Sequence, residues 1–203
     1  MLDIQTSLFE AQDIRLGPID HEKDPEVESM WMHDSEFMHQ MELKPVRPLV
    51  PEMVRKEYQV LEKEIEDENL FYFTIRAREN GRLLGKALLE SIDWSNGNAY
   101  LRLGIGSGGD RGQGFGTQAL GLLVRFAFAE LNLFRVTIVV PEYNQAALAL
   151  FCKFGFLEEV RRRDALLCGE RVWDLLVFGL LHSEWMEQND DCLDTLFEDW
   201  RQI

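Results

Sequence analysis

Cysteine, histidine and basic residues are all scarce in this chain of 203 residues. The three cysteines, Cys152, Cys168 and Cys192, form no C-x-x-C pair, and their odd number does not suit a disulfide framework. The four histidines are scattered, so we expect no metal site. Cysteines without a disulfide pattern are expected to be reduced, which predicts a cytoplasmic protein.

Long apolar runs are also missing. No uninterrupted apolar stretch has the roughly 20 residues that cross a bilayer, and the first residues lack the basic-then-apolar pattern of a secretory signal. Lys and Arg total 21 against 36 Asp and Glu, a net charge of −15. This charge disfavours nucleic acid and anionic membrane as partners. It would attract a cationic or amine substrate, although solvation alone also explains an acidic surface.

What is present fits one domain with a complete core, since 46% of the residues are apolar. Residues 1–11 carry little pattern and are expected to form a loose segment. The domain is expected over residues 12–182. Residues 183–203 are acidic, but Leu193, Leu196, Phe197 and Trp200 have helical spacing. This tail predicts a helix that docks on its own domain or, in the alternative of a homodimer, on a second subunit.

Apolar periodicity predicts a mixed α/β domain. We expect strands at residues 13–19, 70–76, 83–92, 99–105, 135–140, 156–163 and 171–180. We expect helices within 24–41 and at 51–67, 115–131 and 145–154. A turn at Asn96-Gly97 would place Ile92 opposite Leu101 and would put Glu90 on the same face as Leu101.

The segment before the helix at 115–131 is rich in glycine and reads Arg111-Gly112-Gln113-Gly114-Phe115-Gly116-Thr117. Alternating glycines at a helix start expose backbone N–H groups, which bind anions. The missing Gly-Lys pair excludes a nucleoside-triphosphatase loop, and the spacing does not fit the G-x-G-x-x-G dinucleotide pattern. The loop therefore predicts a cradle for another phosphate ligand, with a plain glycine-rich turn as the alternative.

Three motifs in succession resemble the GCN5-related N-acetyltransferase (GNAT) superfamily. Arg111, Gly114 and Gly116 fit its acyl-CoA loop, Q/R-x-x-G-x-G/A. Residues 144–156 are similar to its pattern N-x-x-A-x-x-L-Y-x-K-x-G-F. A third pattern, E-G-x-x-R-x5-G-x4-D, is typical of the branch of ribosomal-protein alanine and serine N-acetyltransferases and spermidine N-acetyltransferases. It is fitted by Glu159, Arg163, Gly169 and Asp174.

The resemblance implies a single GNAT-like domain, with a mixed twisted sheet, helices on both faces and a splay between strands four and five. It implies acetyl-CoA as the acyl donor, with its pantetheine arm in the splay. Residues 104–106 are expected to form a bulge beside it. The cofactor-binding residues implied are Leu103, Gly104, Ile105, Arg111, Gly112, Gln113, Gly114, Phe115, Gly116, Thr117, Asn144 and Phe151.

The catalytic side chains that many relatives use are replaced here. Leu101, Ala147 and Phe151 stand where relatives carry glutamate, serine and tyrosine. Glu90 and Glu142 are our candidate general bases, each with a solvated surface carboxylate as the alternative. The remaining candidates are Asn144, which would orient the intermediate or cap the following helix, and the Tyr143 hydroxyl, for which packing is an equal alternative.

The expected function is transfer of an acetyl group to a primary amine, by direct attack in a ternary complex. The amine belongs to a peptide N-terminus or to a small molecule. The alternative is an acyl-CoA-binding protein without transferase activity. In the family, residues 20–70 shape the acceptor pocket; Trp31, Met32, Phe37 and Met38 lie in this range and are expected on a helix surface.

Overall fold

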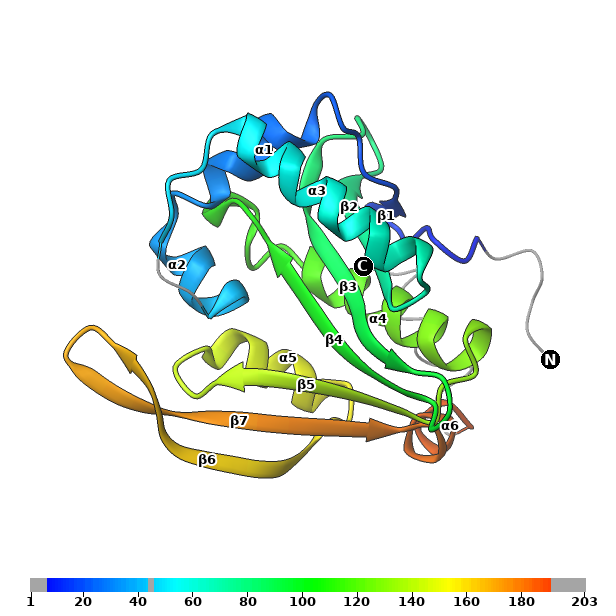
Figure 1. Cartoon of the computed structure of the whole chain (residues 1–203). Coiled ribbons are helices and arrows are strands. Elements are labelled where there is room, and N and C mark those ends of the chain that lie inside the picture. The colour runs from blue at the N-terminus through cyan, green and yellow to red at the C-terminus, as the bar shows by residue number, and fades with distance from the viewer. Residues whose placement is uncertain (1–6, 44–45, 191–203) are drawn as a thin grey trace.

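The computed structural model describes residues 7–43 and 46–190. These residues build one seven-stranded sheet with the order β1-β2-β3-β4-β5-β7-β6 (Figure 1). The strands are β1 (Ile14–Gly17), β2 (Leu70–Ala77), β3 (Leu83–Asp93), β4 (Asn98–Ile105), β5 (Arg135–Pro141), β6 (Leu157–Cys168) and β7 (Arg171–Leu181). The α/β class predicted from the sequence is confirmed.

Helices and helical turns connect these strands. They are α1 (Asp24–Trp31), α2 (Ser35–Phe37), the π-helical turn η1 (Met38–Glu42), α3 (Pro51–Glu66), the 3-10 turn η2 (Gly108–Asp110), α4 (Phe115–Arg125), the π-helical turn η3 (Phe126–Glu130), α5 (Gln145–Lys153) and α6 (His182–Asp190). Within the described ranges, no helix has the length and apolar character to cross a membrane.

Strands β4 and β5 form the splay that the sequence implied. They run parallel and pair at three positions, from Asn98 with Arg135 to Tyr100 with Thr137. Beyond Tyr100 the two strands diverge, while β4 stays paired with β3 as far as Ile105 (Figure 1). The sheet therefore divides into a half built on β1–β4 and a half built on β5, β7 and β6.

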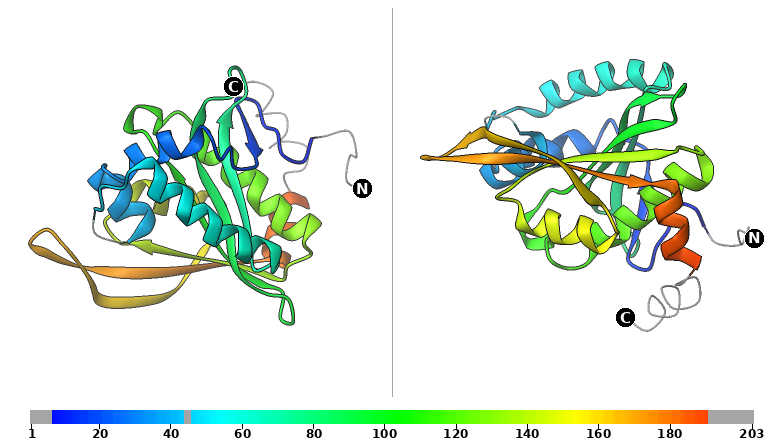
Figure 2. Two further views of the ribbon diagram at one scale, coloured as in Figure 1. Left: turned by 45° about the horizontal axis from the view of Figure 1, so that its top comes forward. Right: turned by 90° about the horizontal axis from the view of Figure 1, so that it is seen from below.

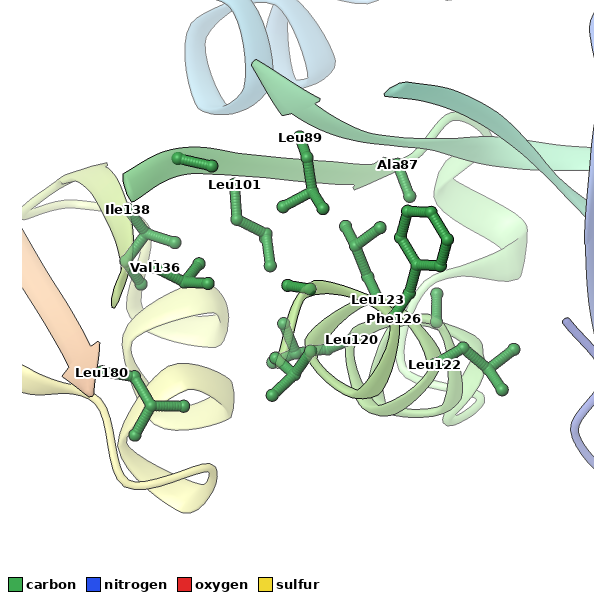
Figure 3. Close-up of a cluster of buried hydrophobic side chains, with 14 of the residues drawn as sticks. Ala87, Leu89, Leu101, Leu120, Leu122, Leu123, Phe126, Val136, Ile138 and Leu180 are labelled. Atoms are coloured by element: carbon green, nitrogen blue, oxygen red, sulfur yellow. The ribbon is translucent and has the colours of Figure 1, made fainter. Parts of the chain in front are cut away.

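Two helical layers cover the sheet, α1–α3 on one face and α4 with α5 on the other (Figure 2). Leu123 and Phe126 point at the sheet residues Ala87, Leu89 and Leu101 (Figure 3). All five are buried, because the apolar stripe of α4 and η3 meets one face of the strands. This packing fixes the start of α4 beside the end of β4.

The prediction of surface positions for Trp31, Met32, Phe37 and Met38 is wrong. Their side chains are 2–6% exposed and form a second core between α1–α3 and the sheet. The chain turns between α1 and α2, which lets apolar residues from both short helices face the same strands. The sequence predicted one or two short helices here but contained no signal for the turn that brings both apolar faces onto the same strands.

Strand β6 is longer than predicted, since it continues past residue 163 to Cys168. Its residues are mostly exposed, because β6 is an edge strand of the sheet. The far end of the β6–β7 hairpin projects from the body (Figure 1). After β7, Trp185 of α6 packs on Phe128 at 5.4 Å between ring centroids. Residues Leu193, Leu196, Phe197 and Trp200 lie outside the described residues.

A buried carboxylate joins the α1–α3 layer to the sheet. Glu28 of α1 is 2% exposed. Its Oε1 accepts hydrogen bonds from the hydroxyls of Tyr58 at 2.6 Å and Tyr72 at 2.7 Å. The ammonium of Lys86 lies 3.6 Å from its Oε2. Burial, together with the adjacent carboxylate, raises the pKa of both tyrosines, so both remain hydrogen-bond donors.

Removing this carboxylate should destabilise the domain strongly. In Glu28→Ala, the Lys86 charge and two hydroxyls lose a buried partner, and we expect a loss of about 3–5 kcal/mol in the free energy of unfolding. Urea denaturation would measure it. Glu57→Ala, on the exposed face of α3, should change stability by no more than about 0.5 kcal/mol. Equal effects of the two substitutions would contradict the structural role of Glu28.

Candidate active site

The glycine loop turns into α4 through two left-handed residues. Gly112 has φ of +74° and Gly114 has φ of +84°, a backbone region that costs L-residues about 1–2 kcal/mol. A Cβ at either position would meet nothing within 4 Å, so space does not require these glycines. Their backbone conformation does.

Gly114 is also the N-cap of α4, and no side chain caps this helix. The N–H groups in the first turn of a helix have no acceptor within the helix. Here they belong to Phe115, Gly116 and Thr117, next to the exposed glycines of the loop. With the helix dipole, they form a place for an anion such as a pyrophosphate. The helix start is thus not closed by a side-chain cap, and the phosphate cradle at this loop stays a prediction.

The side chain of Arg111 turns back from the loop toward the α1–α3 layer. Its Nη2 donates to Asp34 Oδ2 at 2.9 Å and to the Gly106 carbonyl at 2.8 Å. Its Nε donates to the carbonyl of Ile105 at 3.2 Å. Arg111 thus joins the end of β4 to Asp34, whose own carboxylate caps α2.

A second ion pair supports the start of the loop. Arg82 binds Asp110 through two hydrogen bonds of 2.7 and 2.8 Å. The hydrogen bond from the guanidinium lowers the pKa of the Asp110 carboxyl, which is otherwise raised by its burial. A carboxyl with a lowered pKa stabilises the fold above its unfolded pKa of about 3.9, and this contribution is lost as the pH falls through the folded pKa.

Asp110→Asn should therefore destabilise the protein in a pH-dependent way. A charged, bidentate pair contributes on the order of 1 kcal/mol, so at pH 7 we expect Tm to fall by about 2–4 °C. The difference from the unmodified protein should shrink as the pH drops below 4. Thermal unfolding from pH 7 to pH 3 would test this, with Asp67→Asn on the exposed end of α3 as a control for the lost charge. A difference that persists unchanged at pH 3 would contradict the assignment.

Backbone groups of β4 face the splay. The Gly106 N–H donates to the Leu84 carbonyl of β3 at 2.9 Å. Because successive residues direct their N–H groups to opposite sides of a strand, Leu101, Leu103 and Ile105 direct theirs toward the diverging β5. The sequence thus placed Leu103 and Ile105 at the correct strand.

The predicted bulge at residues 104–106 is wrong. The β3–β4 register continues evenly from Leu103 to Ile105, and Gly106 extends it. Gly104 serves a different purpose, since a Cβ there would lie 2.7 Å from Met41 Sδ. The absence of a side chain lets η1 pack directly on β4.

A bulge does occur in β3, and it changes the position of Glu90. Ser91 has φ of +53°, and the register shifts between Glu90 and Asp93. Leu89, rather than Ile92, therefore lies opposite Leu101, and Glu90 lies opposite Tyr100. The extra residue turns Glu90 to the α1–α3 face, so the predicted shared face with Leu101 is wrong. There, Glu90 accepts a hydrogen bond of 2.8 Å from Arg102.

The other two catalytic candidates lie after β5. Glu142 accepts hydrogen bonds from Arg161 at 3.0 Å and from the Asp174 N–H at 3.3 Å. It therefore ties the end of β5 to the β6–β7 hairpin. Asn144 is 9% exposed, and its Oδ1 accepts a hydrogen bond of 3.1 Å from the Ala147 N–H. The predicted N-cap of α5 is confirmed.

The three apolar replacements belong to the core. Leu101 is 4% and Phe151 is 6% exposed. The Phe151 ring stacks edge-on against Phe156 at 5.6 Å, and Ala147 packs against the same cluster. None of the three carries a group that transfers a proton, so acid–base chemistry at this site must come from other side chains.

Tyr143 makes a contact that the sequence could not reveal. Its hydroxyl donates to the backbone carbonyl of His39 at 2.8 Å, across 104 positions of the chain. Burial raises the pKa of Tyr143. The sequence showed the hydroxyl but contained no signal for its partner, because a backbone acceptor has no side-chain pattern.

Comparison with known proteins agrees with this geometry. Residues 13–157 match the family described as acetyltransferase (GNAT) domain. Over 106 residues the chain is 35% identical to a Bacillus subtilis (strain 168) protein whose provisional name is ribosomal N-acetyltransferase YdaF, covering 52% of this chain and 57% of the relative. Over 113 residues it is 29% identical to an uncharacterised N-acetyltransferase, p20, of Bacillus licheniformis, covering 56% and 63%.

The fold is similar to that of a solved structure, the spermidine N-acetyltransferase of Vibrio cholerae in complex with CoA and spermine. The TM-score is 0.74 at 19% identity, covering 86% of this chain and 98% of the other. The matched region spans about three fifths of the two Bacillus relatives. The family match covers most of the chain, with the loop, the splay and the helix layers that it requires, and the chain therefore belongs to the GNAT acetyltransferase family.

Proposed function

We propose that this protein is an acetyl-CoA-dependent N-acetyltransferase that acts on a primary amine by direct attack in a ternary complex. The proposal is supported by two structural features that lie next to each other. A helix start without a side-chain cap lies at Gly114, and beside it β4 directs backbone groups toward a strand that has diverged from it.

These residues fit the acyl donor. The N–H groups of residues 112–117 would hold the pyrophosphate, with no side chain at Gly112 or Gly114 to obstruct it. The backbone of Leu103 and Ile105 would pair with the amides of the pantetheine arm. Bound acetyl-CoA supplies a thioester, which is an activated acyl group. A Leu103 N–H aimed into the splay would stabilise negative charge on the carbonyl oxygen.

The amine must lose a proton to react. An α-amine has a pKa near 8 and a lysine-like amine a pKa near 10, so both are mainly ammonium ions at neutral pH. The ammonium ion first gives one proton to a base and becomes a neutral amine. As the nitrogen then bonds to the carbonyl carbon and the C–S bond breaks, the thiolate leaves, and the second proton passes from the nitrogen to the thiolate or to water. We assign that base to Glu90, acting through water.

Glu90 is preferred over Glu142 for two reasons. Glu90 lies on the α1–α3 face of the sheet, whereas the donor loop begins α4 on the opposite face. An amine that enters from the α1–α3 side would therefore meet the base without crossing the donor loop. Glu142 is held at two points, by Arg161 and by the Asp174 backbone, while Glu90 is paired with Arg102 and would exchange this partner for the bridging water. Asn144 caps α5 with its Oδ1 and would orient the intermediate with its side-chain NH2 group.

The acceptor class is a cationic amine, either a peptide N-terminus or a small molecule. The net charge of −15 favours the approach of a cation. Both acceptor types occur among the similar proteins, since one relative is named as a ribosomal N-acetyltransferase and one structural neighbour as a spermidine N-acetyltransferase.

Coenzyme A release from acetyl-CoA would test the reaction. The panel comprises spermidine, an aminoglycoside, free amino acids and peptides that begin with Ser, Ala or Met. We expect release that depends on one class of acceptor. Glu90→Gln should lower kcat/KM about 10²–10⁴-fold without changing the Kd of acetyl-CoA, and Glu142→Gln should have a much smaller effect. The reverse order would assign the base to Glu142.

A second function is favoured by one observation, the apolar side chains at Leu101, Ala147 and Phe151. An acyl-CoA-binding protein without transferase activity needs no acid or base. Tight binding of acetyl-CoA together with no release for any acceptor would establish that function and would exclude the transferase.

The glycine loop has its own test. In Gly114→Ala, the left-handed φ of +84° becomes costly for the new side chain. The first-turn N–H groups should shift, and we expect the Kd of CoA to rise about tenfold. Gly108→Ala is a matched control, because a Cβ there also meets nothing within 4 Å and its φ is not positive. Isothermal titration calorimetry would compare both, and equal Kd values would contradict the cradle.

A further inference from the structure

Residues 37–42, which we name the bridge segment, connect the two diverging strands on the α1–α3 face. On the β4 side, Met41 packs on Gly104. On the β5 side, the carbonyl of His39 accepts the hydrogen bond from Tyr143. Figure 1 shows α2 and the turn after it lying between the far ends of β4 and β5.

The β4 end of the bridge segment is held by burial. Phe37, Met38 and Met41 are 2–6% exposed and belong to the core of the α1–α3 layer. Asp34, just before the segment, is bound to Arg111. This end is therefore fixed by contacts that no single polar substitution would remove.

The β5 end is held differently, through a side-chain hydroxyl that reaches a backbone carbonyl. Tyr143 lies in the turn between β5 and α5. Its ring meets Trp173 of the hairpin edge-on at 5.7 Å. A phenol is protonated at neutral pH, and burial raises the pKa of Tyr143 further, so the hydroxyl keeps its donor. The hairpin and the end of β5 thus reach the bridge segment through this phenol.

The bridge segment also lies on the opposite face from the donor loop. The loop begins α4, which packs on the other side of the sheet (Figure 2). A donor held by the loop and an amine that passes the bridge segment would meet in the splay from two sides. The donor loop is linked to the β4 end of the bridge segment, through Arg111 and Asp34. The β5 end, which Tyr143 holds, would therefore affect the amine more than the donor.

We propose that Tyr143 is a positioning residue for the acceptor amine: its hydrogen bond to His39 fixes the bridge segment as the acceptor-side wall of the splay. This inference rests on the proposed function. The affinity for the amine depends on how well the wall is held, whereas the binding of acetyl-CoA does not depend on it.

Tyr143→Phe tests the inference by removing one oxygen atom while keeping the ring against Trp173. One hydrogen bond is worth about 0.5–1.5 kcal/mol net, so we expect the KM of the best acceptor to rise about 2- to 12-fold. The kcat should stay within about twofold and the Kd of acetyl-CoA should be unchanged. Ser95→Ala removes a hydroxyl oxygen from an exposed position in the turn between β3 and β4 and should leave all three unchanged.

Amide hydrogen exchange gives a readout without any substrate. In Tyr143→Phe, peptides that contain residues 38–42 should exchange about 2- to 12-fold faster, while peptides from α4 should not change. Unchanged exchange in residues 38–42 would overturn the holding role of Tyr143. Faster exchange with an unchanged acceptor KM would overturn its role toward the amine.

The proposed function and the role of Tyr143 can be tested separately. If the unmodified protein acetylates no amine, the proposed function is wrong and the acceptor role falls with it, while hydrogen exchange still decides whether Tyr143 holds the bridge segment. If the unmodified protein is active and only the predicted effects of Tyr143→Phe are missing, the transferase stands and this inference is wrong.

Discussion

The early separation of β4 from β5 is the constraint on which the other features of the site depend. Two parallel strands that pair at only three positions must leave backbone groups facing outward over the rest of their length. The sheet tolerates this because β4 remains paired with β3, and β5 with β7. The phosphate cradle, the bridge segment and the proposed base are all arranged around this separation.

Polar side chains connect the α1–α3 layer to the sheet and to the glycine loop, because apolar packing alone would let the short helices shift. Glu28 holds α1 to α3 and to two strands, while Arg111 links the end of β4 to the cap of α2. Both bring charge into partly or fully buried surroundings, where geometry matters more than in solvent. Apolar burial holds the layers against the sheet, and these bonds tie α1 and the start of α2 to particular residues of the sheet and the loop.

The sequence predicted the fold well because strands, turns and the glycine loop have local causes. Periodicity and the Asn96-Gly97 turn located the strands, and the glycine spacing located the start of α4, where the cradle is proposed. The sequence did not predict features that depend on one extra residue in a strand or on a contact between distant parts of the chain. The bulge at Ser91 reverses the face of Glu90, yet no pattern distinguishes it from a regular strand. The Tyr143 contact with a distant carbonyl depends on the assembled fold, as does the burial of Trp31 and Phe37.

The outer edge of β6 has a consequence for how copies of the protein meet. An edge strand with exposed backbone groups can recruit a strand from another molecule. In β6, three successive arginines, Arg161 to Arg163, occupy the middle of the strand, and the register shifts between Arg162 and Leu166. Two such edges that approached antiparallel would bring like charges together at an irregular ladder. Pairing of two hairpins in that register would therefore be disfavoured, which removes one of the ways in which their edges could join.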